Sequence, residues 1–227
     1  MTSIGGRKEV DTSTYIIMQI ENQIIKEACV ETFEEAILAE KSGADRIELC
    51  AHLEKDGLTP SPELIQKVCS TLKIPVSVMI RPREGNFIYS KQEVKQMRAK
   101  INSAKKAGAK GIVTGALTLD NKIDFQTITL LAKYAHPLTV TFYKAIDKLD
   151  DPVEGVKILL KIPGITYILT SGGKATAISG AAIIRKMIKA AGSNITIVVA
   201  GKVTDRNLTE VRYLTGANEF HGRRIVG

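Results

Sequence analysis

The chain has 227 residues, of which 44% are hydrophobic and 25% charged, and its formal net charge is +8 at neutral pH. This composition is sufficient for a packed core and excludes an intrinsically disordered chain. The basic residues are spread along the sequence and tryptophan is absent, so we expect no nucleic-acid partner.

Cysteine content and hydropathy bear on the cellular compartment. Three cysteines, an odd number, do not form a disulfide framework, which favours a reducing environment. No apolar run approaches the roughly 20 residues that a membrane helix needs. We therefore predict a cytoplasmic protein without a membrane partner.

Two regions are expected. Residues 1–23 are polar and aperiodic, and we interpret them as an N-terminal extension that is disordered or was added by cloning. In residues 24–227, short apolar runs alternate with amphipathic stretches of helical length, the pattern of a parallel sheet in an α/β domain. The predicted strands are 24–30, 45–50, 75–80, 110–115, 138–143, 165–170, 195–200 and 218–221, and the predicted helices are 33–41, 62–72, 91–106, 124–135, 152–161, 177–191 and 206–214.

Local signals support these elements. Thr32, Ser61, Ser90 and Asp151 stand at positions where helix N-caps belong. A Gly-Ala pair leads from a helix end into a strand at residues 43–44, 108–109 and 216–217, and a glycine there supplies a left-handed helix cap.

The number of strand–helix units decides the fold. Eight units predict a single-domain (β/α)₈ barrel, whereas a doubly wound sheet would usually carry a glycine-rich nucleotide loop after its first strand. The first strand ends in Glu-Ala-Cys-Val-Glu-Thr, without glycine. Few residues follow the eighth strand, so we expect the last helix to be short or absent.

Each of the first two predicted strands carries a carboxylate and a thiol two positions apart. Glu27 and Cys29 share one face of strand one, and Glu48 and Cys50 share one face of strand two. Barrel active sites form at the C-terminal ends of the strands. Two thiolates there would suit a soft ion such as Cu(I), but free cysteines are also common as small buried apolar residues. Both interpretations stay open.

Cationic side chains follow several strands. Arg81, Arg83 and Lys144 are candidate partners for the two buried carboxylates, and the two arginines also suit capture of a carboxylate or phosphate. Alternatively, they form salt bridges that tie down their loop. Lys202, after strand seven, and the Arg223-Arg224 pair, after strand eight, add further cations.

His221 closes the eighth strand and is the best-placed histidine for proton transfer or metal ligation. If the protein is an enzyme, Glu27 and Glu48 would do acid/base work, with His221 or Asp147 assisting. Arg81, Arg83, Lys144 and Lys202 would then bind a small anionic substrate, perhaps a phosphorylated one.

Seven sequence strings, in order along the chain, resemble the CutC family, named for copper homeostasis. They are residues 27–29 (Glu-Ala-Cys), 43–50 (Gly-Ala-Asp-Arg-Ile-Glu-Leu-Cys), 57–61 (Gly-Leu-Thr-Pro-Ser), 79–83 (Met-Ile-Arg-Pro-Arg), 115–118 (Gly-Ala-Leu-Thr), 169–172 (Leu-Thr-Ser-Gly) and 219–222 (Glu-Phe-His-Gly). The resemblance implies a cytosolic barrel, usually a homo-oligomer, that binds copper through cysteines, with Cys29 and Cys50 on the family's cysteine positions.

The sequence departs from the family pattern at the mouth. Tyr143 and Lys144 replace the usual histidine and arginine, Glu84 replaces a glycine, and Lys202 lies where a run of glycines is typical. Three hypotheses follow: a protein that binds Cu(I) through Cys29 and Cys50, an enzyme acting on a small anion, or a degenerate barrel kept for protein contacts.

Overall fold

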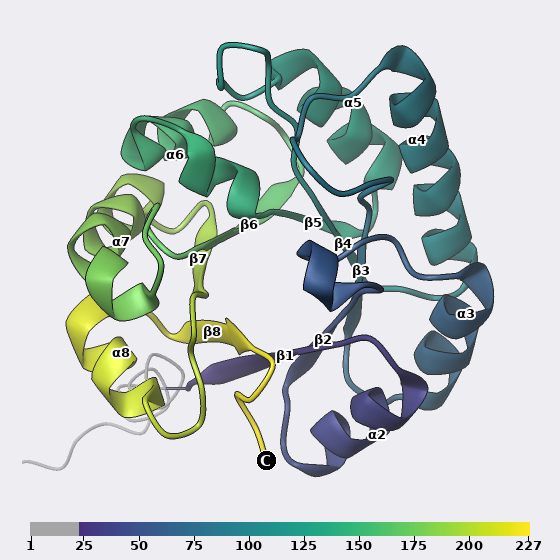
Figure 1. The fold of residues 1–227 in the computed structure, drawn as a ribbon, viewed down its shortest axis with the longest axis horizontal. Coiled ribbons are helices and arrows are strands. Elements are labelled where there is room, and N and C mark those ends of the chain that lie inside the picture. Colours follow the sequence, from purple (N-terminus) through teal and green to yellow (C-terminus); the bar gives the residue numbers. More distant parts are fainter. Residues whose placement is uncertain (1–22) are drawn as a thin grey trace, which may run out of the picture.

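The computed structural model describes residues 23–227, so the expected N-terminal extension lies outside the described part, apart from Gln23. Eight parallel strands close into a barrel in chain order, and helices surround it (Figure 1). This confirms the predicted (β/α)₈ barrel. The strands are β1 (Ile25–Val30), β2 (Arg46–Leu49), β3 (Val76–Met79), β4 (Gly111–Thr114), β5 (Thr139–Phe142), β6 (Ile165–Thr170), β7 (Thr196–Val199) and β8 (Glu219–Gly222).

The helices agree with the predicted positions to within a few residues. They are α2 (Phe33–Lys41), α3 (Pro62–Thr71), α4 (Lys91–Lys106), α5 (Phe125–Ala135), α6 (Pro152–Leu159), α7 (Ala177–Ala191) and α8 (Leu208–Thr215). The side chains of Thr32, Ser61, Ser90 and Asp151 accept hydrogen bonds from backbone N–H groups in the first turns of their helices, as expected of N-caps.

Three differences from the predicted elements have local causes. Helix α8 begins two residues late because Asn207 first forms a turn, accepting from Thr204 N and donating to Lys202 O. Short 3₁₀ helices at Leu53–Lys55 and Lys144–Lys148 follow β2 and β5 and were not expected. Within the described residues, no helix follows β8, as predicted.

Strand register brings the polar residues of the first, second and eighth strands together. Cys29 of β1 pairs with Glu48 of β2, and Glu27 of β1 pairs with His221 of β8. Because all strands are parallel, their C-terminal ends lie at one end of the barrel. No helix in residues 23–227 has the length and apolar character needed to cross a membrane.

Candidate functional site at the barrel mouth

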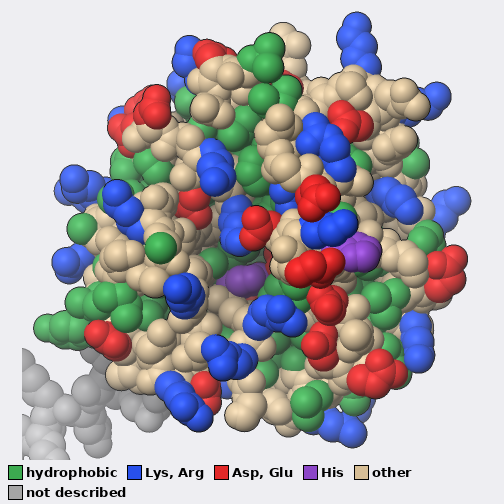
Figure 2. All heavy atoms as spheres, viewed as in Figure 1, with side chains coloured by type: hydrophobic (Ala, Val, Ile, Leu, Met, Phe, Trp, Pro, Cys, Tyr) green, Lys and Arg blue, Asp and Glu red, His purple; other side chains and the backbone are tan. Residues whose placement is uncertain are grey.

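A cavity of about 620 Å³ opens at the C-terminal ends of the strands. Figure 2 shows this end of the molecule, where Lys and Arg side chains gather around a central hollow. Residues from β1, β2, β8 and the loops after β5 and β7 contribute to its lining. The polar lining residues are Cys29, Glu48, Cys50, Asp56, Tyr143, Lys144, Lys202, Thr204, His221, Arg223 and Arg224.

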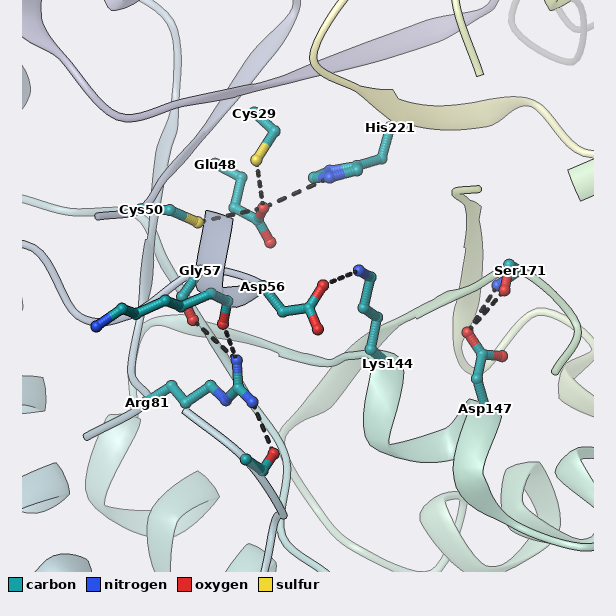
Figure 3. Close-up of polar contacts among 12 residues, drawn as sticks. Cys29, Glu48, Cys50, Asp56, Gly57, Arg81, Lys144, Asp147, Ser171 and His221 are labelled. Atoms are coloured by element: carbon teal, nitrogen blue, oxygen red, sulfur yellow. Dashed lines mark hydrogen bonds and ion pairs between the residues drawn. The ribbon is translucent and has the colours of Figure 1, made fainter. Parts of the chain in front are cut away.

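Two thiols and a carboxylate converge at the base of this cavity. The Sγ atom of Cys29 lies 3.1 Å from Oε2 of Glu48, and the Sγ atom of Cys50 lies 3.5 Å from the same oxygen. The two sulfurs and a Glu48 oxygen all lie within 4.8 Å of one another, and all three residues are buried. In Figure 3 the three side chains point toward one another. The predicted pairing of thiol and carboxylate on adjacent strands is therefore present.

A second network contacts the same carboxylate. His221 bridges two glutamates: its Nδ1 lies 3.0 Å from Oε1 of Glu27, and its Nε2 lies 3.5 Å from Oε2 of Glu48. Arg46 forms an ion pair with Glu27 and a second one, at 2.8 Å, with Glu219. Three of the four residues proposed for acid/base chemistry thus lie in one network.

The two buried glutamates have opposite protonation tendencies. Burial raises the pKa of Glu27, but the charge of Arg46 and the contact with His221 outweigh it and lower that pKa to about 2. Among residues 23–227, Glu48 has no guanidinium partner, and burial raises its pKa well above the usual value. Burial lowers the pKa of His221, yet the nearby Glu48, Cys29 and Glu27 raise it overall. Glu27 therefore favours the carboxylate form, and it faces an imidazole whose pKa its acidic neighbours raise.

The two thiols also differ. A hydrogen bond from Cys50 lowers the pKa of Cys29 well below its ordinary value, against the effect of burial and with the help of His221. The same bond, together with burial, raises the pKa of Cys50. Of the two thiols, Cys29 therefore ionises more readily than Cys50. Such a set can bind a soft metal ion or take part in proton transfer.

Arg81 and Arg83 lie outside the cavity. The Arg81 guanidinium is buried and donates to the carbonyl oxygens of Lys55 and Gly85, at 2.9 Å each. Arg83 pairs with Glu93 and donates to loop oxygens, including that of Ile88 at 2.7 Å. Both arginines tie down their loops, which is the alternative interpretation given above. The expectation that they are partners of Glu27 and Glu48 is wrong. Arg46 and His221 contact Glu27, and His221 also contacts Glu48.

The other predicted residues divide between the mouth and the scaffold. Lys144 and Lys202 line the cavity, and Lys144 pairs with Asp56 at 3.0 Å. Asp147 lies apart from the cysteines (Figure 3) and accepts hydrogen bonds from the backbone N–H groups of Ser171 and Gly173, at 2.9 and 2.8 Å. Its carboxylate holds the loop after β6, which does not support an assisting role in acid/base chemistry.

Arg46 is the site residue that the sequence analysis missed. It stands two positions before Glu48 in β2, so the same alternation that placed Glu48 in the interior would have placed Arg46 there. A cation on that face would have been recognised as a candidate partner of Glu27.

Comparison with known proteins gives the family. The model of the CutC family matches residues 24–226. The chain belongs to the CutC family. The copper homeostasis protein cutC homolog of Homo sapiens is 44% identical over 200 residues, which cover 88% of this chain and 73% of the human protein. A CutC family protein of Pasteurella multocida is 40% identical over 195 residues, covering 86% of this chain and 80% of that protein.

A solved structure agrees with the CutC assignment. The crystal structure of CutC from Streptococcus agalactiae superposes with a TM-score of 0.85 at 32% identity, covering 90% of this chain and all of that chain. An aldolase named QR15 superposes with a TM-score of 0.67 at 14% identity, a likeness that extends to the barrel fold alone. The resemblance to the CutC family found from sequence strings is confirmed.

Proposed function

We propose that this CutC protein serves copper homeostasis by binding Cu(I) between Cys29 and Cys50 at the base of the barrel mouth. The observation that carries the proposal is the convergence of the two sulfurs and a Glu48 oxygen within 4.8 Å. Thiolates are the favoured ligands of Cu(I). The names of the human and bacterial relatives point to the same metal.

The dimensions of the cluster fit an ion of this kind. Metal–thiolate bonds are about 2.3 Å long, as in zinc sites, so two sulfurs on opposite sides of one ion are about 4.6 Å apart. The two sulfurs of the cluster lie within 4.8 Å of each other. Oε1 of Glu48 is buried and has no hydrogen-bond partner among the described residues, so it remains available to an ion or its neighbours.

The charges also fit. The pKa of Cys29 is lowered and that of Cys50 is raised, so Cys50 is the thiol that holds its proton more tightly. Binding of Cu(I) would replace this proton, since only deprotonated thiols ligate metals. Two thiolates and one Cu(I) carry a net charge of −1, and they would lie beside His221, whose pKa the neighbouring acidic groups raise.

Cu(I) should protect two of the three cysteines from alkylation. We expect one equivalent of Cu(I), added anaerobically, to block iodoacetamide labelling of Cys29 and Cys50 and to leave Cys69 of α3 unchanged, as measured by peptide mass spectrometry. Cys69 is the internal control because it lies on an outer helix, partly buried, away from the cluster. Equal labelling of all three cysteines with and without Cu(I) would overturn the proposal.

Two further expectations accompany this function. Three free cysteines support a reducing, cytoplasmic location, which fractionation of the native host cells would test. Large exposed apolar side chains, among them Leu119 and Tyr213, support the expected homo-oligomer. Light scattering of the purified chain measures that state directly.

A further inference from the structure

The rim of the mouth carries more positive charge than the chain itself neutralises. Lys144, Lys202, Arg223 and Arg224 line the cavity, with Asp56 as the carboxylate beside them. Asp56 pairs with Lys144. Within residues 23–227, Lys202, Arg223 and Arg224 form no ion pair.

These three cations come from two loops that are joined to each other. Lys202 follows β7, and the two arginines follow β8. Thr204 and Arg224 form a β-bridge, and Asp205 N donates to Arg224 O at 2.9 Å. Lys202 has a left-handed backbone, with φ of 58°, which is uncommon for a residue with a side chain. These contacts join the backbones of the two loops, and all three cations line the same cavity.

Below the rim, the cavity wall includes a polar group that the fold leaves unpaired. Tyr143 lines the cavity and is 2% exposed, and its ring packs edge-on against Phe87 at 5.7 Å. Its hydroxyl is buried and has no hydrogen-bond partner in the described part of the chain. An unpaired buried hydroxyl is unfavourable, so a ligand that hydrogen-bonds to it gains a favourable contact.

We propose that the barrel mouth binds a small phosphate monoester, with its phosphate at Lys202, Arg223 and Arg224 and its polar body directed toward Tyr143. An arginine guanidinium can form two hydrogen bonds to the oxygens of one phosphate. A cluster of several cations also complements the charge of a phosphate dianion better than that of a singly charged carboxylate. A cavity of about 620 Å³ lies within the range of small-molecule sites. This site goes beyond the copper proposal and uses neither thiol.

The test is calorimetric titration at low ionic strength with ribose 5-phosphate, inorganic phosphate and uncharged ribose. We expect both phosphates to bind and ribose alone to give no signal. The variant Arg223→Gln/Arg224→Gln should weaken both phosphates by roughly tenfold or more, since hydrogen bonds to charged groups are lost. The matched control Arg185→Gln/Lys186→Gln removes two exposed positive charges from the outer helix α7 and should leave both affinities unchanged.

Two more variants locate the ligand. Tyr143→Phe should weaken ribose 5-phosphate and leave inorganic phosphate unaffected, because the hydroxyl contacts the organic body. Cys29→Ser/Cys50→Ser should retain phosphate binding, which separates this proposal from the copper site. Absence of binding by either phosphate at millimolar concentration, or equal weakening in the α7 control, would overturn the site. Unchanged ribose 5-phosphate affinity in Tyr143→Phe would refute the proposed orientation.

Discussion

The double substitution Cys29→Ser/Cys50→Ser is expected to lower the affinity for Cu(I) by at least about three orders of magnitude, or about 4 kcal/mol. Serine keeps the size of the side chain but replaces a soft thiolate with a hard, protonated oxygen. Anaerobic competition with a chromogenic Cu(I) chelator measures the change.

Cys69→Ser is the matched control for this experiment, because it removes a thiol of the same chain outside the cluster. We expect its Cu(I) affinity to equal that of the parent protein. An affinity in the double variant within threefold of the parent value would mean that Cu(I) binds elsewhere.

Glu27→Gln is expected to destabilise the folded protein by about 3 kcal/mol at neutral pH, the size of effect seen when one partner of a buried ion pair is removed. Glu27 is 2% exposed and contacts both Arg46 and His221, so the variant leaves two partly buried basic side chains with less compensation. Urea denaturation at pH 7 measures the loss.

The effect should shrink in acid. The pKa of Glu27 falls from 4.5 to about 2 on folding, so its carboxylate contributes stability that is fully present above pH 4.5 and is lost as pH falls toward 2. At pH 3 the difference between parent and variant should be about half of that at pH 7. Glu210→Gln, on the exposed face of α8, is the control and should show little difference at either pH. A difference for Glu27→Gln that does not change with pH would contradict the role given to Arg46 and His221.

The fold could be predicted almost completely from the sequence. Short apolar runs, helix caps at Thr32 and Ser90, and glycines after helices are local signals, and each acts within a few residues. The turn at Asn207 was missed because its side chain satisfies the backbone at Lys202 and Thr204 before the helix begins, which apolar periodicity does not reveal.

The site could be predicted only in part. Alternation placed Cys29 and Glu48 on interior faces, but their adjacency depends on the register between β1 and β2, which no local pattern specifies. For Arg81, the position along the chain predicted a side chain in the site that the structure places elsewhere. It follows a strand end, yet its guanidinium turns to the loop carbonyls of Lys55 and Gly85, a direction set by tertiary contacts.

The most direct test of the copper site is X-ray absorption at the copper K-edge on the protein loaded anaerobically with one equivalent of Cu(I). Binding between Cys29 and Cys50 predicts a first shell dominated by two sulfur atoms at about 2.3 Å, the length of metal–thiolate bonds. A shell dominated by nitrogen or oxygen, with no more than one sulfur, would contradict it.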